Sequence, residues 1–314
     1  MFLASVIVFL NIVMIQLPLM PTAEGVFINK RFPMTDILYR PQRSTGTDVS
    51  MCPECDCRTF TRKKRVVGGI EAEQNKFPWM AALKLTYGDT STFCGATVIT
   101  KQHLLTAAHC VEGVTADEIQ ASLGGFNQLT HEYDINEITV GIEEIIRHPG
   151  FNLSSLDNDI AILKLDSTIS FNTSQIQPAC LPSTENEDYA GYYGTVIGWG
   201  FTDESQSVSN KMQKVEVPII WTNHCRINYS ILSYSVTDNM MCAGNYFGHQ
   251  GICTGDSGGP LQINIDGLGT MKVVGIVSWS HGCARPYYPG VYTRIDRYKR
   301  WIRDNTGGEC LCEI

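Results

Sequence analysis

The chain has 314 residues, of which 43% are apolar and 10% aromatic, and only 18% are charged. A chain of this length and composition can fill a hydrophobic core, so wholesale disorder is excluded. The formal net charge is −8, from 24 basic and 32 acidic residues, which argues against nucleic acid as a general partner. Twelve cysteines, an even number, favour disulfides in an oxidising compartment over free thiols.

The first segment, residues 2–20, is almost wholly apolar, and polarity returns directly after it. This pattern predicts a signal peptide over residues 1–25, with cleavage after Gly25, or after Ala23 as the alternative. An uncleaved signal-anchor helix is the competing interpretation, because the run nearly has the length of a membrane span; two polar residues and a proline interrupt it. We therefore expect a secreted, extracellular protein without stable membrane association.

Residues 26–65 have little periodicity and end in the basic run Arg62-Lys63-Lys64-Arg65. Charge separates the chain at the same point. Residues 1–65 carry 9 basic and 5 acidic residues, a net charge of +4, whereas residues 66–314 carry 15 and 27, a net charge of −12. We interpret residues 26–65 as an extended prosegment and residues 66–314 as a separate folded domain.

Three segments beyond the prosegment hold a histidine, an aspartate and a serine in informative settings. They are Leu105-Thr106-Ala107-Ala108-His109-Cys110, Asp157-Asn158-Asp159-Ile160-Ala161-Ile162-Leu163 and Gly255-Asp256-Ser257-Gly258-Gly259-Pro260. A serine hydroxyl is a poor nucleophile at neutral pH, so acyl transfer needs an imidazole to take its proton and a buried carboxylate to orient that imidazole. Taken alone, the histidine is more simply a packed side chain and the aspartate the start of a strand. The glycine-flanked serine has no such simple explanation.

In this order the three segments resemble those of the chymotrypsin-like serine proteases, and the resemblance extends over residues 66 to about 306. It implies that Ser257 is the nucleophile, His109 the general base and Asp159 the carboxylate that fixes the imidazole tautomer. Glycines on both sides of the serine would let the N–H groups of Gly255 and Ser257 converge on a developing oxyanion.

The implied fold is all-β: two six-stranded antiparallel β-barrels with a C-terminal α-helix, preceded by the signal peptide and the prosegment. The sequence is compatible with it, because short β-rich segments such as 194–199 and 272–277 recur between turn signals. Tyr298, Trp301 and Ile302 lie at helical spacing and predict the helix near the end of the chain.

The stretch Arg65-Val66-Val67-Gly68-Gly69 resembles the activation site of this family, where cleavage creates a new N-terminus, here Val66. The resemblance nominates Asp256 as the buried carboxylate that pairs with the freed α-amino group. Because Asp256 directly precedes Ser257, this ion pair would make the oxyanion hole depend on proteolysis. The basic run suits a furin-like convertase as the activator, and another Arg/Lys-specific protease is the alternative.

The resemblance also identifies residues of the substrate-binding site. They are Gly251, Ile252, Ser278, Trp279, Ser280 and Gly290. An acid on the pocket floor selects Arg or Lys in this family, but glycine stands at both positions where it would be expected, Gly251 and Gly290. Because an unpaired buried cation is costly, we do not expect cleavage after Arg or Lys. Ile252 and Ser280 narrow the pocket and favour aliphatic or medium-sized apolar residues.

The resemblance implies three disulfides within the catalytic domain: Cys94 with Cys110, Cys225 with Cys242, and Cys253 with Cys283. The remaining six cysteines are Cys52, Cys55, Cys57, Cys180, Cys310 and Cys312. In relatives with a tethered prosegment the position of Cys180 holds the cleaved arm, so we expect one bond from Cys180 to the 52–57 cluster. We extend this hypothesis to two further bonds from the arm to Cys310 and Cys312, and the individual pairs stay open.

Metal sites and sugars are the remaining motifs. Cys52-Pro53-Glu54-Cys55 has the spacing of half a zinc knuckle, but only one more cysteine follows closely, so we prefer disulfides. No cofactor or metal is predicted, because Gly125 stands where the first carboxylate of the calcium loop of some relatives is expected. N-glycosylation sequons begin at Asn152, Asn172 and Asn228.

The sequence thus predicts a secreted serine endopeptidase zymogen, with protein or peptide substrates, an activating protease and protein inhibitors as partners. A non-catalytic protease-like binding protein would lack a triad residue or oxyanion glycine, and none is missing. An α/β-hydrolase would have Gly-x-Ser-x-Gly, which residues 255–259 satisfy, but its histidine would follow the serine, whereas His109 precedes it and His281 has no matching context. Cysteine clusters near both ends of the mature chain suggest an arthropod extracellular or venom-type protease.

Overall fold

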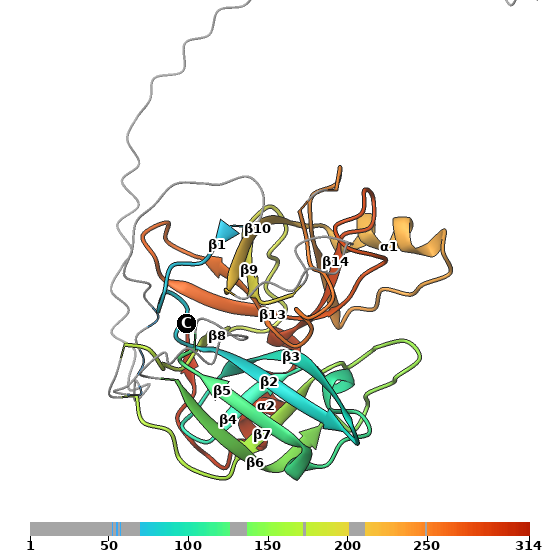
Figure 1. Ribbon diagram of the computed structural model, residues 1–314. Helices are drawn as coiled ribbons and strands as arrows, with labels where there is room; N and C mark the ends of the chain where they lie inside the picture. The colour runs from blue at the N-terminus through green and yellow to red at the C-terminus, as the bar shows by residue number, and fades with distance from the viewer. Residues whose placement is uncertain are drawn as a thin grey trace, which may run out of the picture. The chain divides into compact units, whose positions relative to one another are not determined.

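The first of two β-barrels closes six antiparallel strands in the order β2-β3-β4-β7-β6-β5 (Figure 1). The strands are β2 (Met80–Tyr87), β3 (Thr90–Val98), β4 (His103–Thr106), β5 (Ile119–Leu123), β6 (Ile138–Arg147) and β7 (Ala161–Leu165). Burial follows the two-residue period of a strand: in β5, Ile119, Ala121 and Leu123 are buried while Gln120 is exposed. Apolar side chains therefore fill the interior of this barrel.

The protein is described here by a computed structural model that covers residues 52, 55, 57, 70–125, 137–171, 174–200, 211–248 and 250–314. The expected signal peptide, the bond between Arg65 and Val66 and the sequon residue Asn172 lie outside these residues, as does the prosegment apart from three cysteines.

The second barrel closes another six strands, in the order β9-β10-β11-β14-β13-β12, with β12 pairing back to β9. They are β9 (Tyr193–Gly198), β10 (Gln213–Ile220), β11 (Met240–Ala243), β12 (Pro260–Asn264), β13 (Met271–Trp279) and β14 (Gly290–Arg294), and β1 (Ile70–Glu71) adds an edge strand to β10. β13 is buried along nearly its whole length, because Val273 packs into the core cluster of the first barrel and Val274 into that of the second.

The chain returns to the first barrel at its C-terminal end, where α2 (Lys299–Asp304) packs Ile302 and the adjacent Tyr298 into the first barrel's core cluster. The predicted architecture of two six-stranded barrels with a C-terminal helix is thus confirmed. A further helix, α1 (Thr222–Ser230), was not predicted. It buries only Cys225 and Tyr229, so its apolar face is too narrow to give a helical pattern in the sequence.

Three disulfides hold the prosegment cysteines: Cys52–Cys310, Cys55–Cys312 and Cys57–Cys180. Their attachment points lie together, because β15 (Cys312–Glu313) pairs in parallel with β8 (Cys180–Leu181). The N–H of Met271, at the start of β13, also donates to Cys57 O at 2.7 Å. The arm is therefore bonded to the C-terminal tail, to β8 and to the second barrel, and the zinc-knuckle interpretation is wrong because its sulfur atoms are oxidised.

The other three disulfides are the three that the family resemblance implies, and they join Cys94 to Cys110, Cys225 to Cys242 and Cys253 to Cys283.

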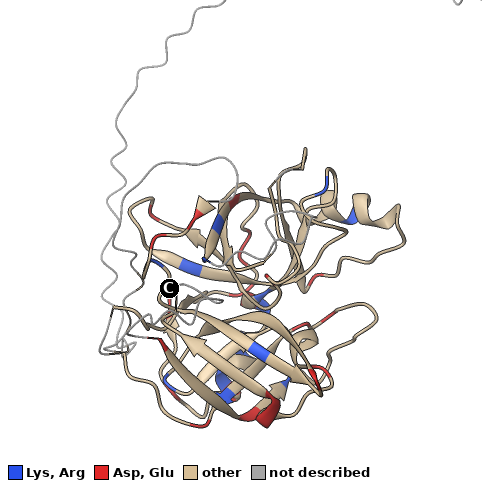
Figure 2. Ribbon diagram, in the orientation of Figure 1, with Lys and Arg blue, Asp and Glu red and all other residues tan. Residues whose placement is uncertain are grey.

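Acidic and basic positions are interspersed over both barrels (Figure 2). No helix in the described part of the chain combines the length and the apolar character of a membrane span.

Candidate active site

Pairing between β4 and β7 brings the candidate histidine and aspartate together. Thr106, the last residue of β4, lies opposite Ala161, the first residue of β7, in an antiparallel register. His109 follows Thr106 by three residues, on a short 3-10 turn, and Asp159 precedes Ala161 by two. Both side chains therefore emerge at the same end of the strand pair, although fifty residues of sequence separate them.

The contact between these two residues is double. Asp159 Oδ2 lies 2.7 Å from His109 Nδ1, and Asp159 Oδ1 accepts the backbone N–H of His109 at 2.8 Å. Asp159 is fully buried, whereas 23% of the His109 side chain is exposed. A carboxylate bound at Nδ1 requires the proton on that nitrogen, so Nε2 of a neutral ring is left without a proton and can act as a base.

The second barrel completes the surroundings of Asp159. Ser278 Oγ, on β13, donates to Asp159 Oδ2 at 2.5 Å, and Thr293 Oγ1, on β14, donates to the backbone carbonyl of Asp159 at 2.7 Å. Ser278 is predicted as a substrate-binding residue, and its hydroxyl has a second role that was not predicted, a hydrogen bond to the buried carboxylate. The aspartate thus belongs to a first-barrel segment but is held by side chains from the second barrel.

Ser257 lies just before β12, and its backbone is hydrogen-bonded next to the segment that carries His109. Ser257 O accepts the N–H of Gly95 at 2.7 Å, and Gly95 follows Cys94, which is disulfide-bonded to Cys110 next to the histidine. Gly258 has a φ of 78°, and a Cβ there would overlap Thr106 Oγ1 and Gly95 O. Glycine therefore lets the serine segment lie directly against the strand ends that carry His109.

No hydrogen bond joins Ser257 Oγ to His109 Nε2 among the described residues; Nε2 lies 3.8 Å from Cys110 Sγ. Nucleophile–base contacts of this kind are often loose before substrate binds. The N–H groups of Gly255 and Ser257 also have no acceptor within the described part of the chain. Both remain available to a developing negative charge.

Asp256 points away from the cleft into the second barrel. Its carboxylate accepts the N–H groups of Gly200 and Cys253, each at 3.0 Å, and it has no ion pair with any described residue. Burial raises the pKa of Asp256 to about 6, against the opposing effect of these two hydrogen bonds. The Asp256 carboxylate also packs tightly against Gly200, because a Cβ added to Gly200 would lie 2.5 Å from this carboxylate.

The residues expected to line the specificity pocket lie together. Ile252 is buried, and a Cβ added to Gly290 would come within 2.8 Å of Ile252 Cγ1 and 3.2 Å of Tyr292 OH. Gly251 is the residue before Ile252, and the Cys253–Cys283 disulfide follows it. Within this group of residues no carboxylate is present, and Ile252 fills space beside the bare backbone of Gly290.

The edge of this region is aromatic. Trp279, at the end of β13, is half-buried, and its ring lies 4.7 Å from that of the buried Tyr229 in an edge-on arrangement. Ser280 is held outside the strand, with its Oγ donating to Gly282 O at 2.7 Å.

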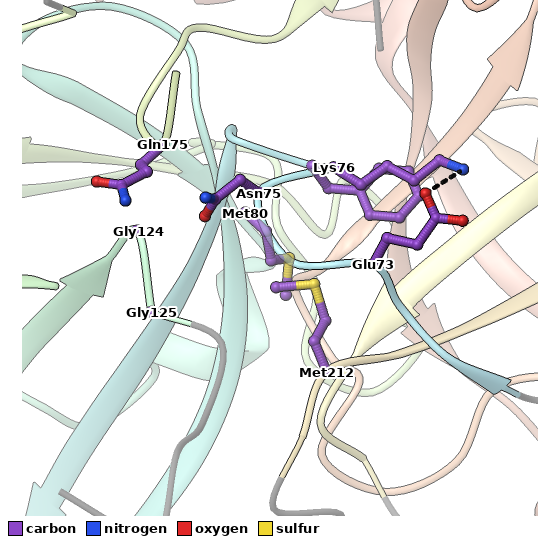
Figure 3. A pocket seen from close by; sticks show the side chains of 9 residues that line it. Glu73, Asn75, Lys76, Met80, Gly124, Gly125, Gln175 and Met212 are labelled. Carbon is purple, nitrogen blue, oxygen red and sulfur yellow. Dashed lines mark ion pairs between the residues drawn. The ribbon is translucent and has the colours of Figure 1, made fainter. Parts of the chain in front are cut away.

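Two other features resemble sites and are not the catalytic one. A small hollow near the start of the first barrel is lined by residues that include Glu73, Lys76 and Met80, with an ion pair of 3.6 Å between the first two (Figure 3). It contains no candidate catalytic residue. Cys94, His109 and Cys110 also cluster as metal ligands would, but the disulfide between the two cysteines leaves no thiolate to bind a metal.

The sequence profile of the trypsin family matches residues 66–302. The chain belongs to the trypsin family. Trypsin Blo t 3 of Blomia tropicalis is 37% identical over 246 residues, which cover 78% of this chain and 87% of that protein. Trypsin-1 of Astacus astacus is 36% identical over 246 residues, 76% of this chain and 99% of that protein. Coagulation factor XI of Bos taurus is 32% identical over 276 residues, 87% of this chain but only 43% of that protein.

This trypsin-family chain is a serine endopeptidase, and protein substrates and activating proteases come with the family.

The contacts of Ser278 and Thr293 with Asp159 were not foreseen. They join residues 119 and 134 positions apart, and nothing local to either residue marks them. The sequence predicted a bond from Cys180 to one of the three arm cysteines without saying which one, because closely spaced cysteines on a short arm give no signal of which partner each will bind.

Proposed function

We propose that this protease is a secreted zymogen in which Ser257 is the nucleophile, His109 the general base and acid, and Asp159 the carboxylate that orients the imidazole. The observation that carries the assignment is the 2.7 Å contact between His109 Nδ1 and Asp159 Oδ2, which leaves Nε2 as the basic nitrogen. The aspartate is fully buried and contacts His109 through both carboxylate oxygens, so it holds the ring and stabilises the imidazolium.

Acyl transfer then proceeds in two stages. His109 Nε2 takes the proton of Ser257 as its Oγ attacks the substrate carbonyl, and gives that proton to the leaving amine as the peptide C–N bond breaks. Water repeats the sequence on the acyl-enzyme and releases the acid. The N–H groups of Gly255 and Ser257 stabilise the negative charge on the carbonyl oxygen in both stages, and a φ of 96° at Gly255 supports this assignment because it favours glycine.

Activation rests on Asp256. A buried carboxylate whose pKa is raised is poorly compensated in the intact chain. Cleavage after Arg65 would free the α-amino group of Val66, and an ion pair between this group and Asp256 would fix the backbone from Gly255 to Ser257. The activator cleaves after a basic residue, and a furin-like convertase fits the run before Arg65.

The pocket favours aliphatic or medium-sized apolar residues on the acyl side of the scissile bond. Gly251 and Gly290 offer no carboxylate to a basic side chain, and Ile252 shortens the pocket next to Gly290. Two of the relatives are named trypsins. We propose that this chain departs from cleavage after Arg or Lys, and that it therefore does not process its own Arg65–Val66 bond.

The secretory route is supported by the apolar leader, residues 2–20, and by six disulfides, which form and persist in oxidising compartments. The arm would stay attached after activation, since Cys52, Cys55 and Cys57 are bonded to cysteines beyond the cleaved bond. Protein inhibitors that enter the cleft in the manner of a substrate are the partners expected to restrain the enzyme.

A peptide library with every residue in turn before the scissile bond tests this function on protein cleaved at Arg65. Cleavage after Val, Leu or Ala supports the proposed pocket, and efficient cleavage after Arg or Lys would overturn it. The intact chain incubated alone provides the second test. Self-cleavage after Arg65 would contradict the pocket assignment, whereas cleavage only on addition of a basic-specific protease supports it.

A further inference from the structure

Asn152 and Asn228, two of the asparagines in glycosylation sequons, differ in what their side chains do. Asn152 lies on the exposed loop between β6 and β7, and its Oδ1 accepts the N–H groups of Ser154 and Ser155, each at 3.0 Å. This turn uses the amide oxygen, and Nδ2 has no partner among the described residues. Leu153 beside it is 60% exposed, so there is open space around the amide.

Asn228 has the opposite surroundings. It is half-buried within α1, next to the fully buried Tyr229, and its Nδ2 donates to Tyr287 O at 2.9 Å. A glycan on this nitrogen would have to grow between α1 and the loop that carries Tyr287. Because an N-linked sugar needs a surface position, Asn152 is the better acceptor of the two.

The loop of Asn152 is fixed at the junction of the two barrels. Asn152 N donates to Asp157 O at 3.0 Å, and Asp157 Oδ1 accepts Thr237 Oγ1 at 2.6 Å and Asn239 Nδ2 at 3.0 Å from the second barrel. Asp159 follows two residues later. A group attached to Asn152 therefore lies on a loop that hydrogen bonds hold to the second barrel.

The segment of the second barrel that contains Thr237 also contacts Trp279, at the end of β13. Tyr234 precedes Thr237 by three residues, and its ring lies 5.6 Å from that of Trp279. Residues 278–280 are among those predicted above to form the substrate-binding site, and we infer that they bind the acyl side of the substrate. The Asn152 loop is thus connected through Asp157 and the Thr237 segment to Tyr234, which contacts Trp279.

We propose that Asn152 carries an N-linked glycan, and that this glycan screens the acyl side of the cleft from large proteins while short peptides still enter. The inference rests on the proposed secretory route, because the sugar donor, a lipid-diphosphate-linked oligosaccharide, is met there. Nδ2 forms a bond to C1 of the sugar and loses one proton to a base of the transferase. The C1–O bond to the diphosphate breaks, and the lipid diphosphate leaves with its electron pair.

The test compares secreted protein with three variants: Ser154→Ala, Ser174→Ala and Ser230→Ala. Each removes the hydroxyl that its sequon requires and leaves the asparagine in place, so the turn of Asn152 keeps its backbone donors. Peptide mapping after enzymatic deglycosylation in H₂¹⁸O should mark Asn152 in the parent protein and not in Ser154→Ala. It should leave Asn228 unmarked in every sample, which makes Ser230→Ala the matched control.

The functional arm uses cleaved enzyme, a short chromogenic peptide and a folded protein inhibitor of serine proteases. We expect Ser154→Ala to bind the inhibitor about three- to tenfold faster, with unchanged kcat/KM for the peptide. An unmodified Asn152 in the secreted parent, or equal association rates for parent and variant, would overturn the proposal. Fluorophosphonate labelling of Ser257 in the same samples reports on the proposed catalytic role separately, so the failure of one proposal is not mistaken for failure of the other.

Discussion

The two barrels contribute unequally to the candidate site. The first supplies His109 and Asp159, which are already joined by two hydrogen bonds and backed by Ser278. The second supplies the Gly255–Ser257 turn. Among the described residues, the N–H groups of Gly255 and Ser257 have no acceptor, and the buried Asp256 has no partner of opposite charge. The contact that orients the proposed base is thus formed among the described residues, whereas in our proposal the turn that carries Ser257 is stabilised only after cleavage at Arg65.

This difference explains how a zymogen can be inactive without any distortion of its catalytic histidine. The register of β4 and β7 brings His109 and Asp159 together, and Ser278 and Thr293 of the second barrel hold the aspartate. In the proposed activation, the turn at Ser257 depends on the positive charge of the α-amino group that cleavage after Arg65 would free. Control is therefore expected at the nucleophile and the oxyanion hole, and not at the base.

The largest effect is expected from Ser257→Ala in the cleaved enzyme. Loss of the nucleophile should lower kcat/KM for a peptide substrate by about 10⁶-fold, because the remaining groups can only bind and polarise the substrate. Ser167 lies on an exposed turn, and among the described residues its Oγ hydrogen-bonds to Asp166 alone; Ser167→Ala is therefore the matched control and should keep full activity. Comparable loss in both variants would point to misfolding.

Asp159→Asn tests the first-barrel half. The amide cannot accept the Nδ1 proton in the same way, so the ring would take the wrong tautomer and kcat should fall by about 10⁴-fold, with little change in KM. Steady-state kinetics with one peptide measures both constants. A loss below tenfold would show that the aspartate does not set the tautomer.

Gly251→Asp tests the pocket. A carboxylate there should raise kcat/KM for a substrate with Arg before the scissile bond by about 10²-fold. Its Cβ would meet Ala284 Cα at 3.3 Å, so the backbone must yield slightly. Gly251→Ser has the same Cβ without the charge and is the control. An equal gain in both variants would mean that space, and not charge, limits cleavage after Arg.

Asp256→Asn tests the second-barrel half. Since burial raises the pKa of Asp256 from 3.8 to about 6, the intact folded chain holds this proton more tightly than the unfolded chain. Stability should therefore fall by about 2–3 kcal/mol as the pH rises through that interval and should then level off. The variant should lack this decline and, once cleaved at Arg65, should remain inactive. Urea unfolding at a series of pH values measures the first effect, and an unchanged pH profile in the variant would contradict the assignment.

The smallest effect is expected from Ser278→Ala. Removing one of the donors to the Asp159 carboxylate should lower kcat about tenfold, since hydrogen bonds to charged groups contribute about 1.5–3 kcal/mol. A positioning role should also shift the pH profile of kcat, whereas a role in substrate binding alone would change KM. The pH profile of kcat and the value of KM together distinguish a role of Ser278 in positioning Asp159 from its predicted role in substrate binding.

Much of the site could be predicted because most of its candidate residues lie in short, recognisable sequence motifs. The serine hexapeptide, the histidine before Cys110 and the two pocket glycines are all visible locally. The contacts of Ser278 and Asp157 could not be predicted, because they join segments of the two barrels that are far apart in the sequence. The arm illustrates the same limit: the cysteines marked a tether, but only the pairing of β8 with β15 determines which partners are within reach.

The most direct test of the account measures fluorophosphonate labelling of the intact chain and of the same preparation after cleavage at Arg65. The account predicts rapid labelling of Ser257 after cleavage, slow or negligible labelling before it, and none in Ser257→Ala. Equal labelling before and after cleavage would contradict the dependence of the nucleophile on activation. Absence of labelling in the cleaved protein would contradict the assignment of Ser257 itself.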